Sequence, residues 1–299
     1  MQLTAQQKRY FETFGFLKFP GLFAMEIQAL IDEFERVFEA NPGLGINGIT
    51  KHPCIVPFID QSAMLSRLLD DPRIDGIASG VLGDDFNYVA GDGDLYGGDT
   101  QWHSDGSFQP HLRFIKMAFY LEPLTVATGA LRVIPGSHRA GEGFAEAAQA
   151  VCASRDHLGI DGSEVPSVAL ETRPGDLVVF DHRLKHASFG GGTRRRMFTL
   201  NLCEHAKTKK QIDVLRTYIR SHAQWWMTST FGPEMLKPEN ESRMRHLRQP
   251  LELQGDMADR AIEHMRKCAE APDSSDPLLM RRKAEARRRL AALEVTEVR

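Results

Sequence analysis

A histidine and an aspartate, both common metal ligands, lie two positions apart in the segment GGDTQWHSDGSF, residues 97–108. If this segment is a β-strand, His103 and Asp105 point to the same face, because side chains alternate along a strand. The two residues would then be about 6–7 Å apart along the chain, close enough to bind one ion together. A metal site therefore requires a third ligand from elsewhere in the chain.

Candidate third ligands follow the segment PGDLVVFD, residues 174–181, in which a turn precedes a predicted buried strand. Two histidines come directly after it, His182 and His186. The facing strands of a jelly roll enclose a cavity, so this fold could bring either histidine to His103 and Asp105. Two histidines and one carboxylate are the ligand set of non-haem Fe(II) oxygenases, which leave the opposite face of the metal open for a cosubstrate and O₂.

Three consecutive arginines, Arg194 to Arg196, begin another run that is typical of a strand. Alternation would direct one of them into the cavity and its neighbours outward. A buried arginine is costly unless it meets an anion, and a small dicarboxylate would provide one through a bidentate pair. In other predicted strands, Lys116 and Arg132 could face either the cavity or solvent.

The remaining sequence predicts helices on both sides of a block of short strands. Short apolar runs separated by glycine, proline and aspartate extend from about residue 86 to residue 203, which indicates a β-sandwich or barrel. A helical or loop insertion interrupts this block at residues 138–158. Beyond it, Ile212, Leu215, Ile219 and Trp226 are predicted to share one helix face. The predicted N-terminal elements are helices at 5–14, 25–40 and 62–83, and a short strand at 16–19.

Composition excludes several classes of protein. The net charge of −3 and the pI of about 6.4 give no general electrostatic reason to bind nucleic acid. Neither a signal peptide nor an apolar run of about 18 residues is found, so we expect no membrane association. The four cysteines are scattered, which predicts reduced thiols in a cytoplasmic protein. An arginine cluster at 281–289 is interpreted as a solvated helix face or a subunit contact.

The motifs WHSDG, TGALRVIPGSHR and PGDLVVFDHRLKHAS…RRRMFTLN, in this order, resemble the phytanoyl-CoA dioxygenase family of Fe(II)/2-oxoglutarate-dependent oxygenases. The resemblance covers about residues 1–205. It implies a mainly β fold with flanking α-helices, whose core at about residues 86–205 is a double-stranded β-helix, a cupin-like jelly roll. Residues 206–299 would then form a helical C-terminal extension that acts as a lid or an oligomer contact.

The resemblance also implies roles for individual residues. His186, followed by Ala187-Ser188, matches the second histidine ligand of the family, so that His103, Asp105 and His186 would bind Fe(II). Ser188 and Arg195 would hold the distal carboxylate of the cosubstrate 2-oxoglutarate, with Arg196 as the alternative. Related halogenases lack the carboxylate ligand, so its presence here favours hydroxylation, desaturation or ring chemistry.

The expected activity is that of a dioxygenase that hydroxylates or otherwise oxidises an unactivated C–H bond of a small organic substrate, with O₂ as oxidant and succinate and CO₂ as coproducts. Two alternatives are a zinc-dependent hydrolase, since the same ligands suit Zn²⁺, and a non-catalytic cupin-like binding protein. A buried arginine for a dicarboxylate has no role in the hydrolase. The expected partners are a small-molecule substrate and further copies of this chain, bound through the C-terminal helices.

Overall fold

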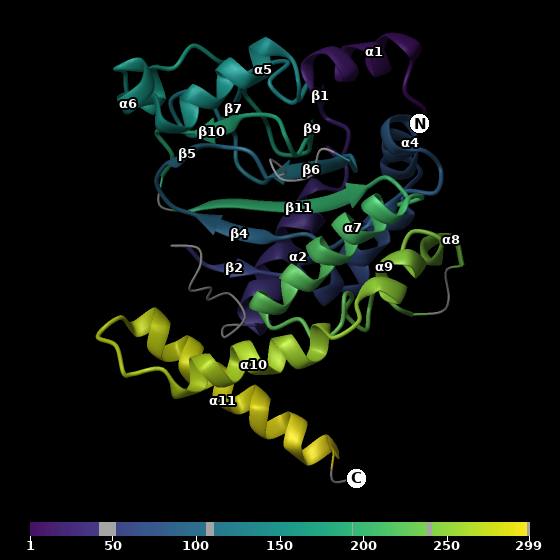
Figure 1. The fold of residues 1–299 in the computed structure, drawn as a ribbon, viewed down its shortest axis with the longest axis vertical. Helices are drawn as coiled ribbons and strands as arrows, with labels where there is room; N and C mark the ends of the chain where they lie inside the picture. Colours follow the sequence, from purple (N-terminus) through teal and green to yellow (C-terminus); the bar gives the residue numbers. More distant parts are fainter. Residues whose placement is uncertain (42–51, 106–110, 193, 238–240, 298–299) are drawn as a thin grey trace.

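Two antiparallel β-sheets form the centre of the computed structural model, which describes residues 1–41, 52–105, 111–192, 194–237 and 241–297 (Figure 1). The larger sheet has the order β1-β9-β6-β11-β4-β2, and β3 also pairs with β11. Its strands are β1 (Phe16–Phe19), β9 (Leu177–Asp181), β6 (Phe114–Tyr120), β11 (Arg195–Cys203), β4 (Gly93–Tyr96), β2 (Cys54–Ile55) and β3 (Asn87–Tyr88). The smaller sheet has the order β5 (Thr100–His103), β10 (His186–Ser188), β7 (Leu131–Val133) and β8 (Val168–Leu170).

Each central strand of the larger sheet buries both of its faces, and side-chain alternation divides its residues between two cores. In β6, Ile115 and Phe119 pack against the helical layer, whereas Ala118 and Tyr120 face the smaller sheet. This arrangement explains why the sequences of β6, β9 and β11 are apolar runs without a regular polar repeat. Polar side chains on the inner faces therefore point into the space between the two sheets.

Helices cover the outer faces of both sheets. α1 (Ala5–Phe14) begins at the Thr4 capping box and ends at Gly15, as the sequence predicts. α2 (Ile27–Ala40) buries Leu30, Phe34 and Val37 against the larger sheet. The predicted insertion forms α5 (Gly143–Ala147) and α6 (Ser154–Leu158) with short 3₁₀ segments, and its cluster includes residues of the smaller sheet.

Two details of the predicted helices are wrong. The predicted helix at 62–83 is divided into α3 (Ala63–Ser66), a 3₁₀ turn and α4 (Pro72–Leu82), because Asp71 caps a new helix whose first residue is Pro72. Trp226 does not continue the helix face of Leu215 and Ile219. That helix, α7, ends at Ser221, and Trp226 follows a 3₁₀ turn with a left-handed φ of 64°.

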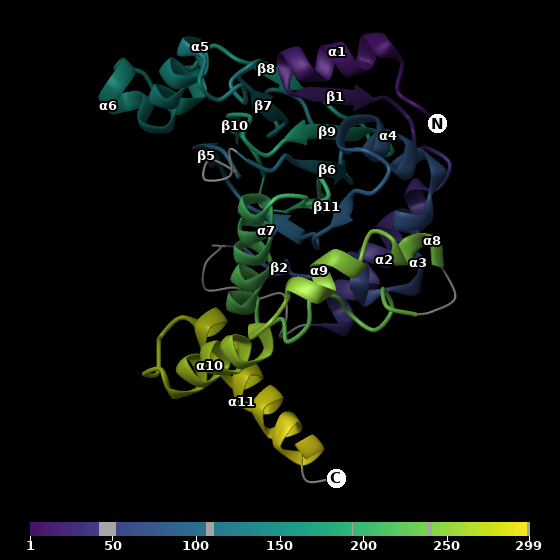
Figure 2. The same cartoon turned by 45° about the vertical axis from the view of Figure 1, so that its right-hand side comes forward.

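The C-terminal residues contribute to the main core and also form a separate pair of helices. Phe231, Met235 and Leu247 belong to the same hydrophobic cluster as Phe58 and Phe198. The pair of α10 and α11 lies at one end of the molecule, away from the smaller sheet (Figures 1 and 2). The C-terminal helices are α7 (Lys209–Ser221), α8 (Glu241–Met244), α9 (Arg248–Leu253), α10 (Met257–Glu270) and α11 (Pro277–Glu297). In the described ranges no helix has the length and apolar character of a membrane span. Self-association through these helices stays a prediction.

A buried carboxyl group joins the C-terminal segment to the rest of the protein. Asp60 is 1% exposed, and its two oxygens accept hydrogen bonds from the Tyr88 hydroxyl and the Gly232 backbone N–H, both at 2.9 Å. Burial raises the pKa of Asp60 to about 6, although both hydrogen bonds favour the ionised form. The folded state therefore prefers the protonated carboxyl, and the free energy of unfolding that this group contributes falls as the pH rises through 6.

We expect Asp60→Asn to remove this pH dependence, because an amide fits the same space without titrating. Relative to the wild type, the variant should gain roughly 2 kcal/mol in free energy of unfolding between pH 4 and pH 7, as a rise in pKa of about two units implies over this range. Urea unfolding across this range measures the change. Asp85→Asn, at a carboxylate that is 53% exposed, is the matched control and should show much less. An equal stability difference between Asp60→Asn and the wild type at both pH values would contradict the assignment.

Candidate active site

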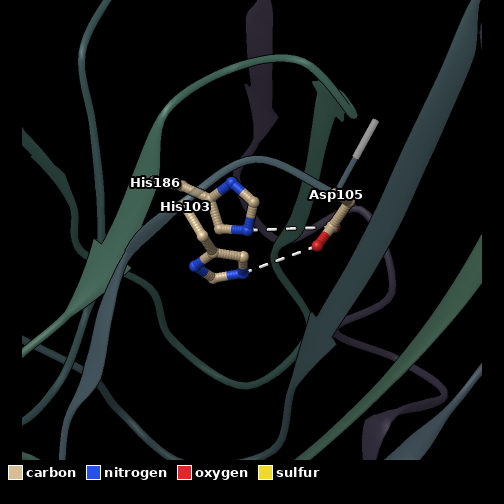
Figure 3. Close-up of side chains that lie close together, drawn as sticks. All are labelled: His103, Asp105 and His186. Carbon is tan, nitrogen blue, oxygen red and sulfur yellow. Dashed lines mark ion pairs between the residues drawn. The ribbon is translucent and has the colours of Figure 1, made fainter. Parts of the chain in front are cut away.

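The smaller sheet brings His103, Asp105 and His186 to one point. β5 and β10 are antiparallel neighbours, and their register places His103 directly opposite His186. Asp105 directs its carboxylate at both rings, with Oδ1 3.5 Å from His103 Nε2 and Oδ2 3.8 Å from His186 Nε2 (Figure 3). One ligand atom from each residue lies within 4.8 Å of the other two. The structure thus assembles the predicted triad, although β5 ends at His103 and Asp105 follows the strand instead of belonging to it.

Backbone carbonyls fix the tautomers of both histidines. His103 Nδ1 lies 2.8 Å from the carbonyl oxygen of Gln101, and His186 Nδ1 lies 2.8 Å from that of Leu184. A carbonyl oxygen can only accept, so each Nδ1 carries a proton, and in the neutral imidazole the Nε2 lone pair lies on the side of Asp105. This is the arrangement that metal-binding histidines adopt, and it supports a divalent cation between the three side chains.

Burial and neighbouring charges set the protonation of the triad. Burial opposes protonation of His103, but the adjacent Asp105 carboxylate outweighs it and raises the pKa of His103. Burial lowers the pKa of His186 to about 3, so this imidazole is neutral. Burial alone would raise the pKa of Asp105, but the neighbouring Lys116 ammonium holds it well below its usual range. The Lys116 ammonium lies 2.9 Å from Asp105 Oδ2. The side chain of His103 is 41% exposed, whereas that of His186 is 7% exposed, so an ion would reach the triad from the His103 side.

His182, the other histidine considered from sequence, is not part of this cluster. It follows β9 of the larger sheet, four residues before His186 enters β10 of the smaller sheet. Its Nε2 lies 3.2 Å from Asn201 Oδ1, and the residue is 2% exposed. The turn between β9 and β10 therefore carries the chain from one sheet to the other and separates the two histidines.

Arg195 lies in a cradle of main-chain carbonyls. Its Nη1 donates to Gly129 O and its Nη2 to Gly98 O, both at 2.7 Å. Nη1 also donates to Ser188 Oγ, which itself donates to Gly129 O at 2.9 Å. Arg195 is 8% exposed, and it forms no ion pair within the described ranges. The structure therefore brings together the two residues predicted to bind a carboxylate, with a buried cation that fits an anionic ligand.

Alternation along β11 separates the three arginines. Arg196 donates to Glu122 and, at 2.8 Å, to Glu35 on α2, whereas Arg194 donates to Glu35 at 2.6 Å. Both thus contact acidic side chains on the outer side of the larger sheet. Only Arg195 of the three lines the space between the sheets.

One pocket contains both groups of residues. The triad, Arg195 and Ser188 line a space of about 540 Å³, including its open mouth. Sequence reasoning left the direction of Lys116 open and did not identify Tyr96 and Tyr120, which also line this pocket. Side chains alternate between the two faces of the strand FIKMAFY. Alternation alone would therefore have placed Lys116 on the same face as Tyr120, opposite Ile115 and Phe119.

Comparison with known proteins agrees with this geometry. The family of the phytanoyl-CoA dioxygenase (PhyH) matches residues 11–197, more than half of the chain. An ectoine dioxygenase from Sphingopyxis alaskensis is 26% identical over 224 residues, which cover 64% of this chain and 72% of that protein. An ectoine dioxygenase from Bordetella parapertussis is 29% identical over 157 residues, which cover 46% of this chain and 50% of that protein.

Solved structures share the fold. EctD from S. alaskensis has a TM-score of 0.54 and 26% identity, over 68% of this chain and 77% of that one, and has also been solved with bound Fe. HygX from Streptomyces hygroscopicus, with nickel and 2-oxoglutarate bound, has a TM-score of 0.54 and 20% identity. That match covers 70% of this chain and 90% of HygX.

We expect a divalent cation such as Mn²⁺ to stabilise the folded protein through the triad. At a concentration of 100 Kd the gain is about 2.7 kcal/mol, or a rise in Tm of roughly 5 °C for a chain of this size. His186→Ala should abolish the rise, and His182→Ala, the matched control, should retain it. Thermal unfolding with and without the metal measures both, and an equal loss in the two variants would contradict the ligand assignment.

Proposed function

The chain belongs to the phytanoyl-CoA dioxygenase family, and we propose that it is a non-haem Fe(II)- and 2-oxoglutarate-dependent dioxygenase whose iron is bound by His103, Asp105 and His186. The convergence of two Nε2 lone pairs and one carboxylate carries this proposal, because this ligand set is the facial triad of such enzymes. The two antiparallel sheets that enclose the site, and the likeness to EctD, support a double-stranded β-helix as the core.

Arg195 and Ser188 are proposed to bind the distal carboxylate of 2-oxoglutarate. They are in contact with each other, they line the same pocket as the triad, and Arg195 has no acidic partner within the described ranges. The outward contacts of Arg196 with Glu35 and Glu122 favour Arg195 over it. EctD from S. alaskensis has been solved with 2-oxoglutarate bound, which supports 2-oxoglutarate as the anion.

When bound, iron and 2-oxoglutarate supply the oxidation of an unactivated C–H bond by O₂, with succinate and CO₂ as coproducts. The residues of the chain orient the metal ligands and provide the charges around the metal and the cosubstrate. The carbonyls of Gln101 and Leu184 orient the two imidazoles, and Lys116 keeps Asp105 ionised. The guanidinium of Arg195 offsets negative charge on the cosubstrate, and the apolar walls of the pocket limit the access of water. The carboxylate of Asp105 favours hydroxylation or a related oxidation over halogenation.

The zinc-hydrolase alternative is disfavoured by the same pocket. A hydrolase has no use for a buried, carbonyl-bound arginine without an acidic partner beside the metal. A protein that only binds an organic ligand would not need two histidines whose Nε2 atoms both face one possible cation site. A cytoplasmic location is part of the proposal and rests on sequence alone.

The proposal is tested by anaerobic titration of the metal-free protein with Fe(II) and then 2-oxoglutarate. A visible charge-transfer band should appear only when both are present, and His186→Ala should abolish it. Arg195→Met should raise the dissociation constant of 2-oxoglutarate at least about tenfold, because a charge-assisted hydrogen bond is lost. Arg196→Met should change it little. No band in a folded, iron-loaded protein would refute cosubstrate chelation.

A second prediction tests the carbonyl cradle. Gly129 and Gly98 both have positive φ, and both carbonyls accept from Arg195. A Cβ on Gly129 would lie 2.5 Å from Arg195 Nη1, whereas a Cβ on Gly98 would meet nothing within 4 Å. Gly129→Ala should therefore weaken 2-oxoglutarate binding at least about tenfold, and Gly98→Ala much less, although the backbone strain is alike. Equal dissociation constants in the titration would show that the cradle does not position Arg195.

A further inference from the structure

A second pocket lies next to the first and shares Tyr96, Asp105 and Lys116 with it. Its volume is about 940 Å³, including its open mouth. One wall is formed by α7 and the following 3₁₀ turn, His222–Trp225, which lie outside the residues matched by the family. The opposite wall comes from β4, β11 and the turn after β9. The candidate iron ligand Asp105 therefore lies between the pocket of Arg195 and a pocket that the C-terminal residues complete.

His182 lines this second pocket and has a hydrogen-bond acceptor without a partner in the described part of the chain. Asn201 Nδ2 donates to Asp92 Oδ1 at 3.4 Å, so Asn201 Oδ1 is the atom that faces His182 Nε2 at 3.2 Å. The proton of the imidazole is therefore on Nε2, and Nδ1 carries a lone pair. Burial lowers the pKa of His182, which keeps the ring neutral. His182 Nδ1 has no hydrogen-bond partner within the described ranges, and the residue is 98% buried, given its 2% exposure.

Asp92 provides a second acceptor. Its Oδ1 accepts from Thr199 Oγ1 at 2.6 Å, and its side chain is 20% exposed. Burial opposes ionisation, but Lys116 outweighs burial and lowers the pKa of Asp92. Lys116 is the one lysine or arginine among the described lining residues, and it lies 4.0 Å from Asp92 Oδ1 and 2.9 Å from Asp105 Oδ2. The positive charge of this pocket is therefore already paired.

Aromatic side chains from the C-terminal wall complete the pocket. Tyr218 and His222 are in edge-to-face contact at 4.9 Å, and Trp225 lies in the same wall. His222 is 7% exposed, burial lowers its pKa to about 4, and its Nδ1 has no hydrogen-bond partner within the described ranges. A ligand here would meet neutral imidazoles, a carboxylate and aromatic rings, which together suit a polar group and a small carbon skeleton.

We propose that this second pocket binds the substrate, and that the substrate is a compact polar molecule that donates hydrogen bonds through hydroxyl or amino groups to His182 and Asp92. The inference rests on the proposed dioxygenase function. A fatty-acyl chain would leave His182 Nδ1 without a donor and would exclude water from the ionised Asp92 carboxylate, and both effects oppose its binding. A phosphate or carboxylate would face Asp92 with no unpaired cation to receive it.

Calorimetry of the anaerobic protein loaded with Fe(II) and 2-oxoglutarate tests the inference. The probes are a set of amino sugars, cyclitols and amino alcohols, compared with octanoyl-CoA and octanoate. At least one donor compound should bind, and His182→Phe and Asp92→Asn should each weaken its binding about tenfold or more. In Asp92→Asn the amide oxygen can still accept the hydrogen bond from Thr199 Oγ1, so we expect this variant to fold. It therefore tests the inference even if His182→Phe does not fold. Asp213→Asn, on the same helix α7 at a carboxylate that is 52% exposed, is the control and should leave binding unchanged.

The charge-transfer band separates this inference from the function on which it rests. If the band forms but no donor compound binds, the proposed function stands and the inference fails. Binding of octanoyl-CoA or octanoate alone, or donor binding that persists in both His182→Phe and Asp92→Asn, would also overturn it. If the band does not form, the failure lies in the cosubstrate site itself.

Discussion

The antiparallel pairing of β5 with β10 is the constraint on which the candidate site depends. It places His103 opposite His186 across two strands that are far apart in the sequence. A shift of one residue would turn one imidazole to the other face of the smaller sheet, where Trp102 and Ala187 pack against the insertion helices. The hydrophobic pattern of these short strands therefore fixes the metal geometry together with the fold. Asp105 depends on this pairing as well, because it can reach both rings only from the end of β5.

The larger sheet supplies the charges that this geometry needs. Lys116 on β6 and Arg195 on β11 both occupy inward positions of strands whose other faces are packed against helices. Each is a buried cation, but their surroundings differ. Lys116 is compensated by Asp92 and Asp105, whereas the partners of Arg195 in the described ranges are two carbonyls, a hydroxyl and the Tyr96 ring, with no carboxylate. Lys116 therefore orients the acidic side chains of the site, whereas the positive charge of Arg195 is available for an anionic ligand.

Much of the site could be predicted from the sequence, because its residue types are rare in combination and their order is informative. The resemblance to the family favoured Arg195 over Arg196, whereas alternation alone predicted only that one arginine of the three points inward. The end of β5 before Asp105, and the break at Pro72, depend on local turns and caps that periodicity does not describe. The direction of Lys116 and the contribution of Tyr218 and His222 could not be predicted, because they depend on which elements pack against each other. Contacts between segments that are far apart in the sequence produce no regular residue spacing that a single sequence could reveal.

The packing of Phe231, Met235 and Leu247 shows which part of the chain belongs to the main hydrophobic core. The family matches only residues 11–197, yet Phe231 and Leu247 complete the core behind the larger sheet, and α7 forms a wall beside Asp105. The residues matched by the family and the residues that form one hydrophobic core are therefore different sets in this protein. The wall beside Asp105 is built by a part of the chain that the family does not match, so the shape of that pocket cannot be read from the shared scaffold alone.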